Sequence, residues 1–277
     1  MNLLKSHKTF AGLTQFWEHD SNETKTKMKF SSFVPAGEIR GALLFLSGLT
    51  CTDENFICKA GAQQFLAEAG LIIVCPDTSP RGLHLPHEHD AYDFGSGAGF
   101  YIDATTPDYC NHYRMYSYVT GELYHIVQEQ FNIPNYKISI MGHSMGGHGA
   151  LVMALRSPNK FKSISAFSPI VHPSVSPWGE KAFAGYLGGN HEDWLQYDAT
   201  ELVKSGKRHP SLIYIDQGLK DEFLETQLLM QDFEDACHKA GQLVKVNYRE
   251  GYDHSYYFIS SFIADHVSFH VRALELA

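Results

Sequence analysis

The sequence lacks any run of about 18 apolar residues, the length that a membrane-spanning helix requires. Its first residues, Met-Asn-Leu-Leu-Lys-Ser-His, also lack the apolar core of a secretory signal peptide. The five cysteines are an odd number and follow no tight spacing pattern, which argues against a disulfide framework. We therefore expect a reduced, cytoplasmic protein with no membrane segment.

Basic charge is scarce as well, because 22 Lys and Arg residues stand against 31 Asp and Glu residues, giving a formal net charge of -9 at pH 7. Nucleic-acid phosphates need a basic face, so no nucleic-acid partner is expected. The sequence shows no internal repeat and no low-complexity linker, and its 44% hydrophobic content excludes a disordered chain. These features predict a single domain over residues 1–277.

Short apolar runs recur along the chain and are typical of strands buried on both faces of a parallel sheet. They cover residues 42–46, 71–75, 138–141 and 212–215. Two further strands are expected, an edge strand at 28–34 and another strand at 244–249.

Helical patterns alternate with these strands. Between residues 113 and 131 apolar side chains recur at spacings of three and four, and similar stretches follow Gly146 and Ser255. This alternation predicts an α/β fold with a mostly parallel central sheet sandwiched between helices. Active sites in such sheets lie beyond the carboxyl ends of the strands.

The most specific motif is Gly142-His143-Ser144-Met145-Gly146, a G-x-S-x-G pentapeptide between an expected strand and an expected helix. In such a turn the serine takes a strained conformation, and only small flanking residues let the strand and the helix pass closely. A chance match in a glycine-rich turn is the alternative, which the strand–turn–helix context disfavours. The motif predicts an α/β-hydrolase fold with Ser144 as the nucleophile of a serine hydrolase.

A serine nucleophile needs a base that a third group orients, and in this fold the chain order is serine, acid, histidine. His254 follows the expected strand 244–249 and is the candidate base. Two acids follow the strand 212–215. We favour Asp221, on the loop beyond that strand, because Asp216 directly ends the strand and is held more stiffly; Asp216 remains the alternative.

An oxyanion hole requires two N–H donors. One is expected from Met145, which follows the nucleophile, and the other from the loop after strand 42–46. We assign the second donor to Leu49, with Gly48 as the alternative.

Several segments together carry a resemblance to a known family. They are Leu46-Ser-Gly-Leu-Thr-Cys51, Pro76-Asp-Thr-Ser-Pro-Arg-Gly82, Gly97-Ala-Gly-Phe-Tyr101, Gly142-His-Ser-Met-Gly-Gly-His-Gly-Ala150, Asp216-Gln-Gly218 and Gly251-Tyr-Asp-His-Ser-Tyr-Tyr-Phe258. From about Phe10 to its last residue the chain resembles the S-formylglutathione hydrolase family, also called esterase D.

The resemblance implies hydrolysis of S-formylglutathione to formate and glutathione, in formaldehyde detoxification, with side activity on short-chain esters. Matched by position, it supports Ser144, Asp221 and His254 as a catalytic triad, and it places Cys51 near the active site. It also implies a small-molecule substrate, no cofactor, a cytoplasmic location and a homodimer. A general short-chain carboxylesterase, an acyltransferase and a non-catalytic protein of this fold are the alternatives.

Weaker signals complete the list of candidates. Trp178 is assigned to the wall of a small acyl pocket, with a core or interface role as the alternative. No metal site is expected, because a solvated loop is the simpler interpretation of the segment with His84, His87, His89 and Asp90. The candidates for binding the carboxylates of glutathione, which the sequence does not rank, are Lys59, Arg81 and Lys181.

Overall fold

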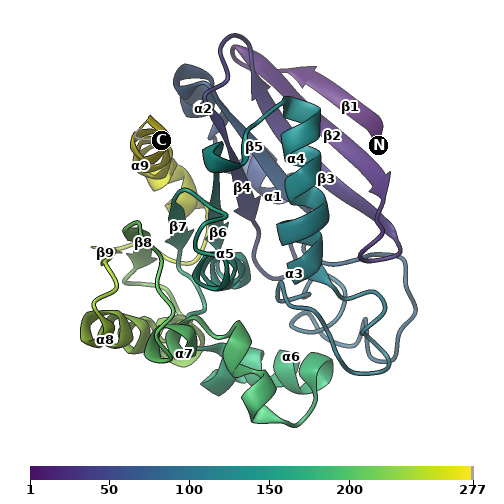
Figure 1. Cartoon of the computed structure of the whole chain (residues 1–277), viewed down its shortest axis with the longest axis vertical. Helices are drawn as coiled ribbons and strands as arrows, with labels where there is room; N and C mark the ends of the chain where they lie inside the picture. Colours follow the sequence, from purple (N-terminus) through teal and green to yellow (C-terminus); the bar gives the residue numbers. More distant parts are fainter. Residues whose placement is uncertain (276–277) are drawn as a thin grey trace.

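The computed structural model describes residues 1–275, and within this range nine strands form one sheet (Figure 1). Across the sheet the strand order is β1-β2-β3-β5-β4-β6-β7-β8-β9. The strands are β1 (Asn2–Lys8), β2 (Gly12–Asp20), β3 (Lys27–Pro35), β4 (Gly41–Leu46), β5 (Leu71–Pro76), β6 (Ile138–His143), β7 (Ile164–Phe167), β8 (Ile213–Gly218) and β9 (Val244–Arg249).

The six strands from β4 to β9 pair in parallel, whereas β1, β2 and β3 extend the sheet by antiparallel pairing. Helices cover both faces. One face carries α1 (Glu54–Lys59), α2 (Gln63–Ala69) and α9 (Tyr256–Glu275), and the other carries α3 (Met115–Ser117), α4 (Tyr124–Phe131), α5 (Met145–Arg156), α7 (Ala199–Lys204) and α8 (Met230–Ala240). This arrangement confirms the predicted α/β-hydrolase fold.

The expected strands are all present, but the edge position predicted for residues 28–34 is wrong. This segment is β3, and β2 pairs with it along its whole length from Gly12↔Pro35 to Asp20↔Lys27. The true edge is β1, whose side chains are all exposed and therefore show no apolar pattern. The expected helix at 113–131 comprises α3, a π-helical turn at Tyr118–Leu123 and α4.

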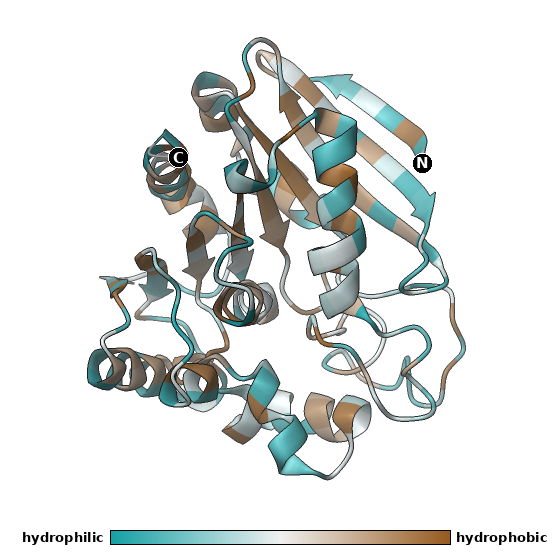
Figure 2. Ribbon diagram, viewed as in Figure 1, coloured by the Kyte–Doolittle hydropathy of each residue, from teal (hydrophilic) through white to brown (hydrophobic). Residues whose placement is uncertain are grey.

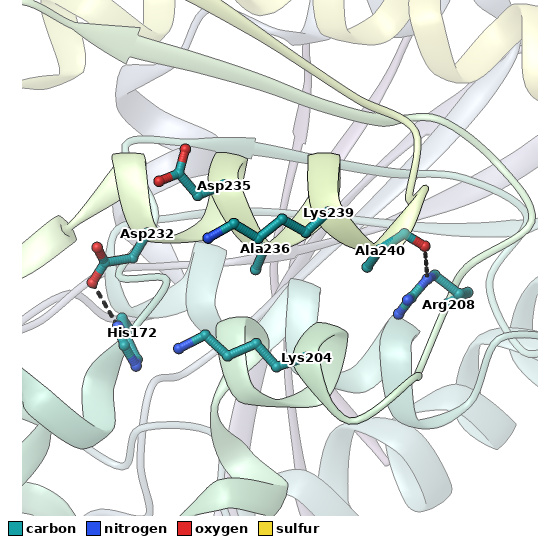
Figure 3. A pocket seen from close by; sticks show the side chains of 8 residues that line it. All are labelled: His172, Lys204, Arg208, Asp232, Asp235, Ala236, Lys239 and Ala240. Atoms are coloured by element: carbon teal, nitrogen blue, oxygen red, sulfur yellow. Dashed lines mark hydrogen bonds and ion pairs between the residues drawn. The ribbon is translucent and has the colours of Figure 1, made fainter.

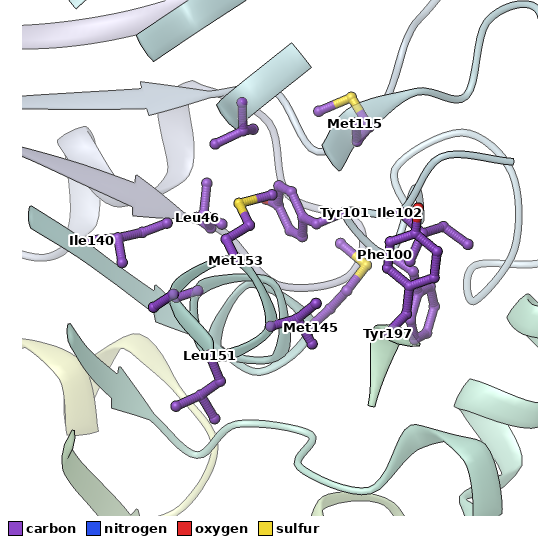
Figure 4. Packing of buried hydrophobic residues seen from close by; sticks show 14 of the residues in the cluster. Leu46, Phe100, Tyr101, Ile102, Met115, Ile140, Met145, Leu151, Met153 and Tyr197 are labelled. Atoms are coloured by element: carbon purple, nitrogen blue, oxygen red, sulfur yellow. The ribbon is translucent and has the colours of Figure 1, made fainter. Parts of the chain in front are cut away.

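The apolar core is divided by the sheet into two clusters, one on each face. Figure 2 shows the central strands as the most hydrophobic part of the ribbon and β1 as largely polar. In Figure 4 side chains of α5 pack between the central strands and the segment 100–102. This packing fixes α5, and with it the turn between β6 and α5. In the described part of the chain, no helix combines the length and the apolar character needed to cross a membrane.

The helix α6 (Pro177–Leu187) follows β7 and lies on the side of the sheet where the parallel strands end (Figure 1). Ser176 caps this helix by accepting a hydrogen bond from the N–H of Gly179, and Pro177 occupies its first turn. The cap and the proline set the start of α6, so that Trp178 is placed close to the loops that carry the candidate site.

Candidate active site

The turn between β6 and α5 holds Ser144 in a strained conformation, with φ 56° and ψ -120°. Such a backbone costs about 1–3 kcal/mol and is typical of functional sites. A Cβ at Gly142 would overlap the carbonyl group of Gly146, and a Cβ at Gly146 would overlap that of Leu46. Both glycines are therefore required for the close passage of strand and helix.

Backbone hydrogen bonds fix this turn in the sheet. The N–H of Ser144 donates to the carbonyl of Phe167 at 3.0 Å, and its own carbonyl accepts from the N–H of Ile170 at 3.2 Å. The side chain of Ser144 is only 3% exposed. It lies at the N-terminal end of α5, where unpaired N–H groups favour negative charge.

The histidine and the favoured acid of the sequence analysis lie side by side. His254 Nδ1 and Asp221 Oδ2 are 2.6 Å apart, and the other carboxylate oxygen accepts from the N–H of Phe223 at 3.0 Å. Burial is the largest influence on Asp221 and favours its protonated form. The hydrogen bond and the charge of His254, together with the N–H of Phe223, outweigh burial and lower the pKa of this carboxyl below its ordinary value. Asp221 is thus an ionised acceptor that orients the imidazole.

Two loops carry this pair, one after β8 and one between β9 and α9, and they are joined directly. The N–H of Lys220 donates to the carbonyl of Tyr252 at 2.8 Å, and the N–H of Leu219 donates to the carbonyl of Arg249 at 3.0 Å. Cross-linked loops of this kind hold the acid and the histidine in a fixed relation.

Asp216, the alternative acid, is fully buried and has other partners. It accepts hydrogen bonds from Asn247 Nδ2 at 2.7 Å and from Arg249 Nε at 3.0 Å. These bonds connect β8 to β9, so Asp216 braces the two strands while Asp221 faces the imidazole.

His254 lies next to the turn between β6 and α5. Its ring packs against that of His143, the residue before Ser144, with centroids 4.5 Å apart. Burial lowers the pKa of His143 well below its ordinary value, which keeps it a neutral neighbour. Within residues 1–275 no hydrogen bond joins Ser144 Oγ to His254. Catalytic hydrogen bonds of ligand-free enzymes are often long and tighten when substrate binds.

The loop after β4 lies directly against Ser144, the candidate nucleophile. A Cβ at Gly48 would stand 3.1 Å from Cβ of Ser144. The N–H groups of Gly48 and Leu49 donate no hydrogen bond to any of the described residues. Met145 is the first residue of α5, where an N–H has no partner inside the helix. Free donors from both segments therefore lie near Ser144, and the structure leaves Gly48 and Leu49 as alternatives.

The segment 97–101 supports this loop. The N–H of Thr50 donates to the carbonyl of Gly97 at 2.9 Å, and the hydroxyl of Tyr101 donates to the carbonyl of Ser47 at 2.9 Å. The backbone of Tyr101 is itself in the left-handed region, with φ 52°. These contacts hold residues 47–51 in place; we call this segment the oxyanion loop, because the sequence predicts an oxyanion donor there.

Trp178 lies near the histidine through an intermediate ring. The rings of Trp178 and Phe223 are 4.7 Å apart, and those of Phe223 and His254 are 5.1 Å apart. The indole N–H of Trp178 donates to the hydroxyl of Tyr92 at 3.1 Å. Phe223 was missed from the sequence, although its place two residues after Asp221 was a usable signal.

Cys51 is a half-buried free thiol at the end of the oxyanion loop, and burial raises its pKa. Its carbonyl accepts from Arg81 Nη2 at 2.9 Å and from the hydroxyl of Thr78 at 2.6 Å. The thiol is therefore a neutral group held beside the site by its backbone.

The basic candidates and the histidine-rich loop have other contacts. Arg81 is paired with Asp77 at 2.7 Å, and Lys181 forms an ion pair with Asp93. Lys59 lies over the ring of Tyr256. In the loop, His87 pairs with Asp90 at 2.7 Å and His89 with the carbonyl of Leu83. Among the described residues, no group of three or more His, Cys, Asp or Glu side chains is arranged to hold a metal ion.

A separate cavity of about 610 Å³ lies between α7 and α8 (Figure 3). Its basic side chains are largely engaged, since Lys204 pairs with Glu201 at 2.7 Å and Arg208 donates to the carbonyls of Ala240 and Val203. His172 is similarly held by Asp232 at 2.7 Å. None of the residues of the candidate site lines this cavity.

Comparison with known proteins supports one family. A family profile described as putative esterase matches residues 21–269. Curated proteins named S-formylglutathione hydrolase from Bos taurus and Rattus norvegicus are each 50% identical over 276 residues, which is 98% of this chain and 98% of theirs.

The solved structures agree. An S-formylglutathione hydrolase from Agrobacterium tumefaciens superposes with a TM-score of 0.96 at 44% identity, covering 99% of this chain and 100% of that one. A fluorophosphonate-binding serine hydrolase from Staphylococcus aureus, with a TM-score of 0.74 and 17% identity over 94% of this chain and 98% of that one, shares the fold. The chain belongs to the S-formylglutathione hydrolase family of the α/β-hydrolase superfamily.

Proposed function

We propose that this protein hydrolyses S-formylglutathione to formate and glutathione through an acyl-enzyme formed on Ser144. The observation that carries the proposal is the 2.6 Å contact between His254 and Asp221, on loops that converge on the strained turn of Ser144. A base oriented by a buried carboxylate is what a serine nucleophile needs. The family supplies the substrate, since relatives 50% identical over nearly the whole chain carry that name.

In the first step His254 takes the proton of Ser144 while Oγ attacks the formyl carbon. The N–H groups of Met145 and Leu49 hold the developing oxyanion, and Asp221 stabilises the imidazolium. The carbon–sulfur bond then breaks, and the glutathione sulfur receives the proton from His254. A water molecule, deprotonated by His254, attacks the formyl ester; formate leaves, and Ser144 Oγ recovers its proton.

The substrate pocket is proposed to lie between Cys51 and Trp178. The indole, backed by Phe223, forms a wall close to His254, which suits a small acyl group. Because a formyl group is the smallest acyl group, a rigid aromatic wall is enough to favour it over longer chains.

We further propose that residues 1–277 form a single domain that works without a cofactor, in the cytoplasm, as a homodimer. The five cysteines are free, which fits a reducing compartment. Light scattering coupled to size-exclusion chromatography tests the dimer, for which a monomer at micromolar concentration is the opposing result. Full activity after dialysis against a chelator tests the absence of a metal cofactor.

The decisive measurement is a comparison of kcat/KM for S-formylglutathione and for an aryl acetate. We expect the thioester to be preferred by about 100-fold or more, which corresponds to about 2.7 kcal/mol of transition-state stabilisation. Equal values for the two substrates would identify a general short-chain esterase instead. Faster release of the aryl alcohol with an added acceptor alcohol, together with ester formation, would identify an acyltransferase.

A further inference from the structure

A second pocket lies at the start of β3 and the end of β5, and Thr52, the residue after Cys51, is part of its lining. It has a volume of about 380 Å³, and its lining includes Lys29, Asp53, Asp77 and Arg81. Pro76, the last residue of β5, pairs with Phe30 of β3, so this is the edge of the sheet where the parallel strands end. We call it the Asp53 pocket.

Most charges of this pocket are already paired. Asp77 binds Arg81 through both oxygens, at 2.7 Å and 3.2 Å, and Lys27 pairs with Asp20 at 3.1 Å. Glu54 is exposed and pairs with Lys5 at 3.7 Å. A ligand would gain little from any of these groups.

Two opposite charges remain without a partner. Asp53 is 5% exposed, yet its carboxylate makes no hydrogen bond or ion pair with another of the residues 1–275. Burial, and next the charge of Asp77, raises the pKa of Asp53 to about 6. Lys29 is exposed and forms no ion pair in the same range. The Asp53 oxygens are not among the fully buried unpaired atoms of the described residues, so they open into the pocket that Asp53 lines. A largely buried carboxylate without a charged partner is costly, and a cationic ligand in this pocket would reduce that cost.

We propose that the Asp53 pocket binds the γ-glutamyl end of the glutathione moiety, with its ammonium on Asp53 and its α-carboxylate on Lys29. This inference rests on the proposed function and names the part of the site that recognises the thiol half of the substrate. The zwitterionic amino-acid head has one positive and one negative group on the same carbon. It therefore complements the two charges that the protein leaves unpaired.

The reach of the substrate fits this placement. A Cβ at Gly48 would stand 3.1 Å from Cβ of Ser144, so Gly48 lies next to the candidate nucleophile. Asp53 follows Gly48 five residues later, and chain length limits the separation of Gly48 and Asp53 to about 17 Å. From the formyl carbon to the γ-glutamyl ammonium, glutathione extends over roughly 11 Å of bonded chain. The side chain of Asp53 adds its own length to that reach. Residues 48–53 thus connect the neighbour of Ser144 to the lining of the pocket within a span of this order.

The test compares Asp53→Asn with Asp235→Asn, which makes the same chemical change at an exposed position of α8 far from the pocket. The readout is the ratio of kcat/KM for S-formylglutathione to kcat/KM for an aryl acetate, which has no γ-glutamyl group. We expect this ratio to fall about 10- to 100-fold in Asp53→Asn, as for the loss of a charged hydrogen bond, and to stay within about twofold in Asp235→Asn. In Lys29→Gln we expect a fall of about 3- to 10-fold.

A truncated substrate gives a second measurement that needs no variant at Asp53. The wild type should act on S-formylglutathione at least about tenfold better than on S-formyl-cysteinylglycine, and Asp53→Asn should lose most of that difference. If the wild type prefers S-formylglutathione to the aryl ester but Asp53→Asn keeps that preference, the pocket assignment is wrong and the proposed function stands. If the wild type shows no preference at all, the proposed function itself fails.

Discussion

Replacing Asp53 by asparagine should make the protein more stable at neutral pH. The side chain is 5% exposed and lacks a partner in the described part of the chain, so its negative charge is a cost of folding. An amide has the same shape and carries no charge. The variant therefore removes the cost while leaving the packing of the Asp53 pocket unchanged.

The magnitude follows from the pKa. Raising it from 3.8 to about 6 corresponds to about 3 kcal/mol of lost stability once the group is fully ionised. The amide needs hydrogen-bond partners of its own, so we expect a net gain of about 1–3 kcal/mol at pH 8. For a chain of this size the midpoint of thermal unfolding should rise by roughly 2–5 °C.

The sign of the pH dependence is fixed by the direction of this pKa change. Because Asp53 binds its proton more tightly in the folded state, its contribution to stability falls as the pH rises from 3.8 through 6 and is constant above that range. The difference in unfolding free energy between Asp53→Asn and the wild type should therefore be smallest below pH 3.8 and largest at pH 7 to 8.

Urea unfolding of the ligand-free protein at a series of pH values measures this difference directly. Asp235→Asn is the control, because it changes the net charge equally at an exposed site where little effect is expected. A difference that does not grow between pH 5 and pH 8 would refute the reasoning. So would a variant that is less stable than the wild type at pH 8.

Four further predictions follow from the candidate site and the core. Ser144→Ala should lower kcat by about 1000-fold or more and abolish the burst of acylation in a rapid-mixing assay, with an unchanged circular-dichroism spectrum; higher residual activity would argue for another nucleophile. Asp221→Asn should lower kcat by about 1000-fold as well, whereas Asp216→Asn should act mainly through a lower unfolding midpoint and keep kcat within about tenfold; the reverse result would exchange the two acids. Trp178→Ala should widen acyl-chain tolerance, measured over a series of aryl esters, and an unchanged profile would remove the indole from the pocket wall. Burial lowers the pKa of His270 to about 3, so the stability that it contributes should be present above pH 6.5 and be lost as the pH falls toward 3; the fall in unfolding free energy over that range should be shallower in His270→Gln.

The central part of the fold could be predicted because its physical causes are local. The buried strands β4 and β5 read as uninterrupted apolar runs, and only Ser139 interrupts the run 138–141 of β6, since helices cover both faces of these strands. The turn of Ser144 was predictable for a similar reason, because only glycine at positions 142 and 146 permits it. In both cases a few residues adjacent in the sequence determine the local structure.

The outer strands and the pocket could not be predicted in this way. All side chains of β1 are exposed, and β1 holds its place by backbone pairing with β2, which leaves no mark on the sequence. The position of β3 inside the sheet depends on those two strands, so the expectation of an edge strand was wrong. The choice of Asp221 over Asp216 rested on the position of each acid relative to the end of its strand and on the family resemblance. The partners of Asp216, which are Asn247 and Arg249 of β9, could not be read from the segment that carries the two acids.

Asp53 was not singled out at all, because its burial comes from β3 and β5, and nothing in its own segment distinguishes it from an exposed acid. Replacing Asp53 by asparagine should change two measured quantities in opposite directions: the unfolding free energy should rise, and kcat/KM for the glutathione thioester should fall. A carboxylate with a purely structural role would show a loss of stability on replacement, and a solvated one would show neither effect. Only a buried charge that binds a cationic group of the substrate accounts for both changes together. The stability and kinetic measurements therefore jointly test whether the unpaired carboxylate of Asp53 is a ligand-binding group.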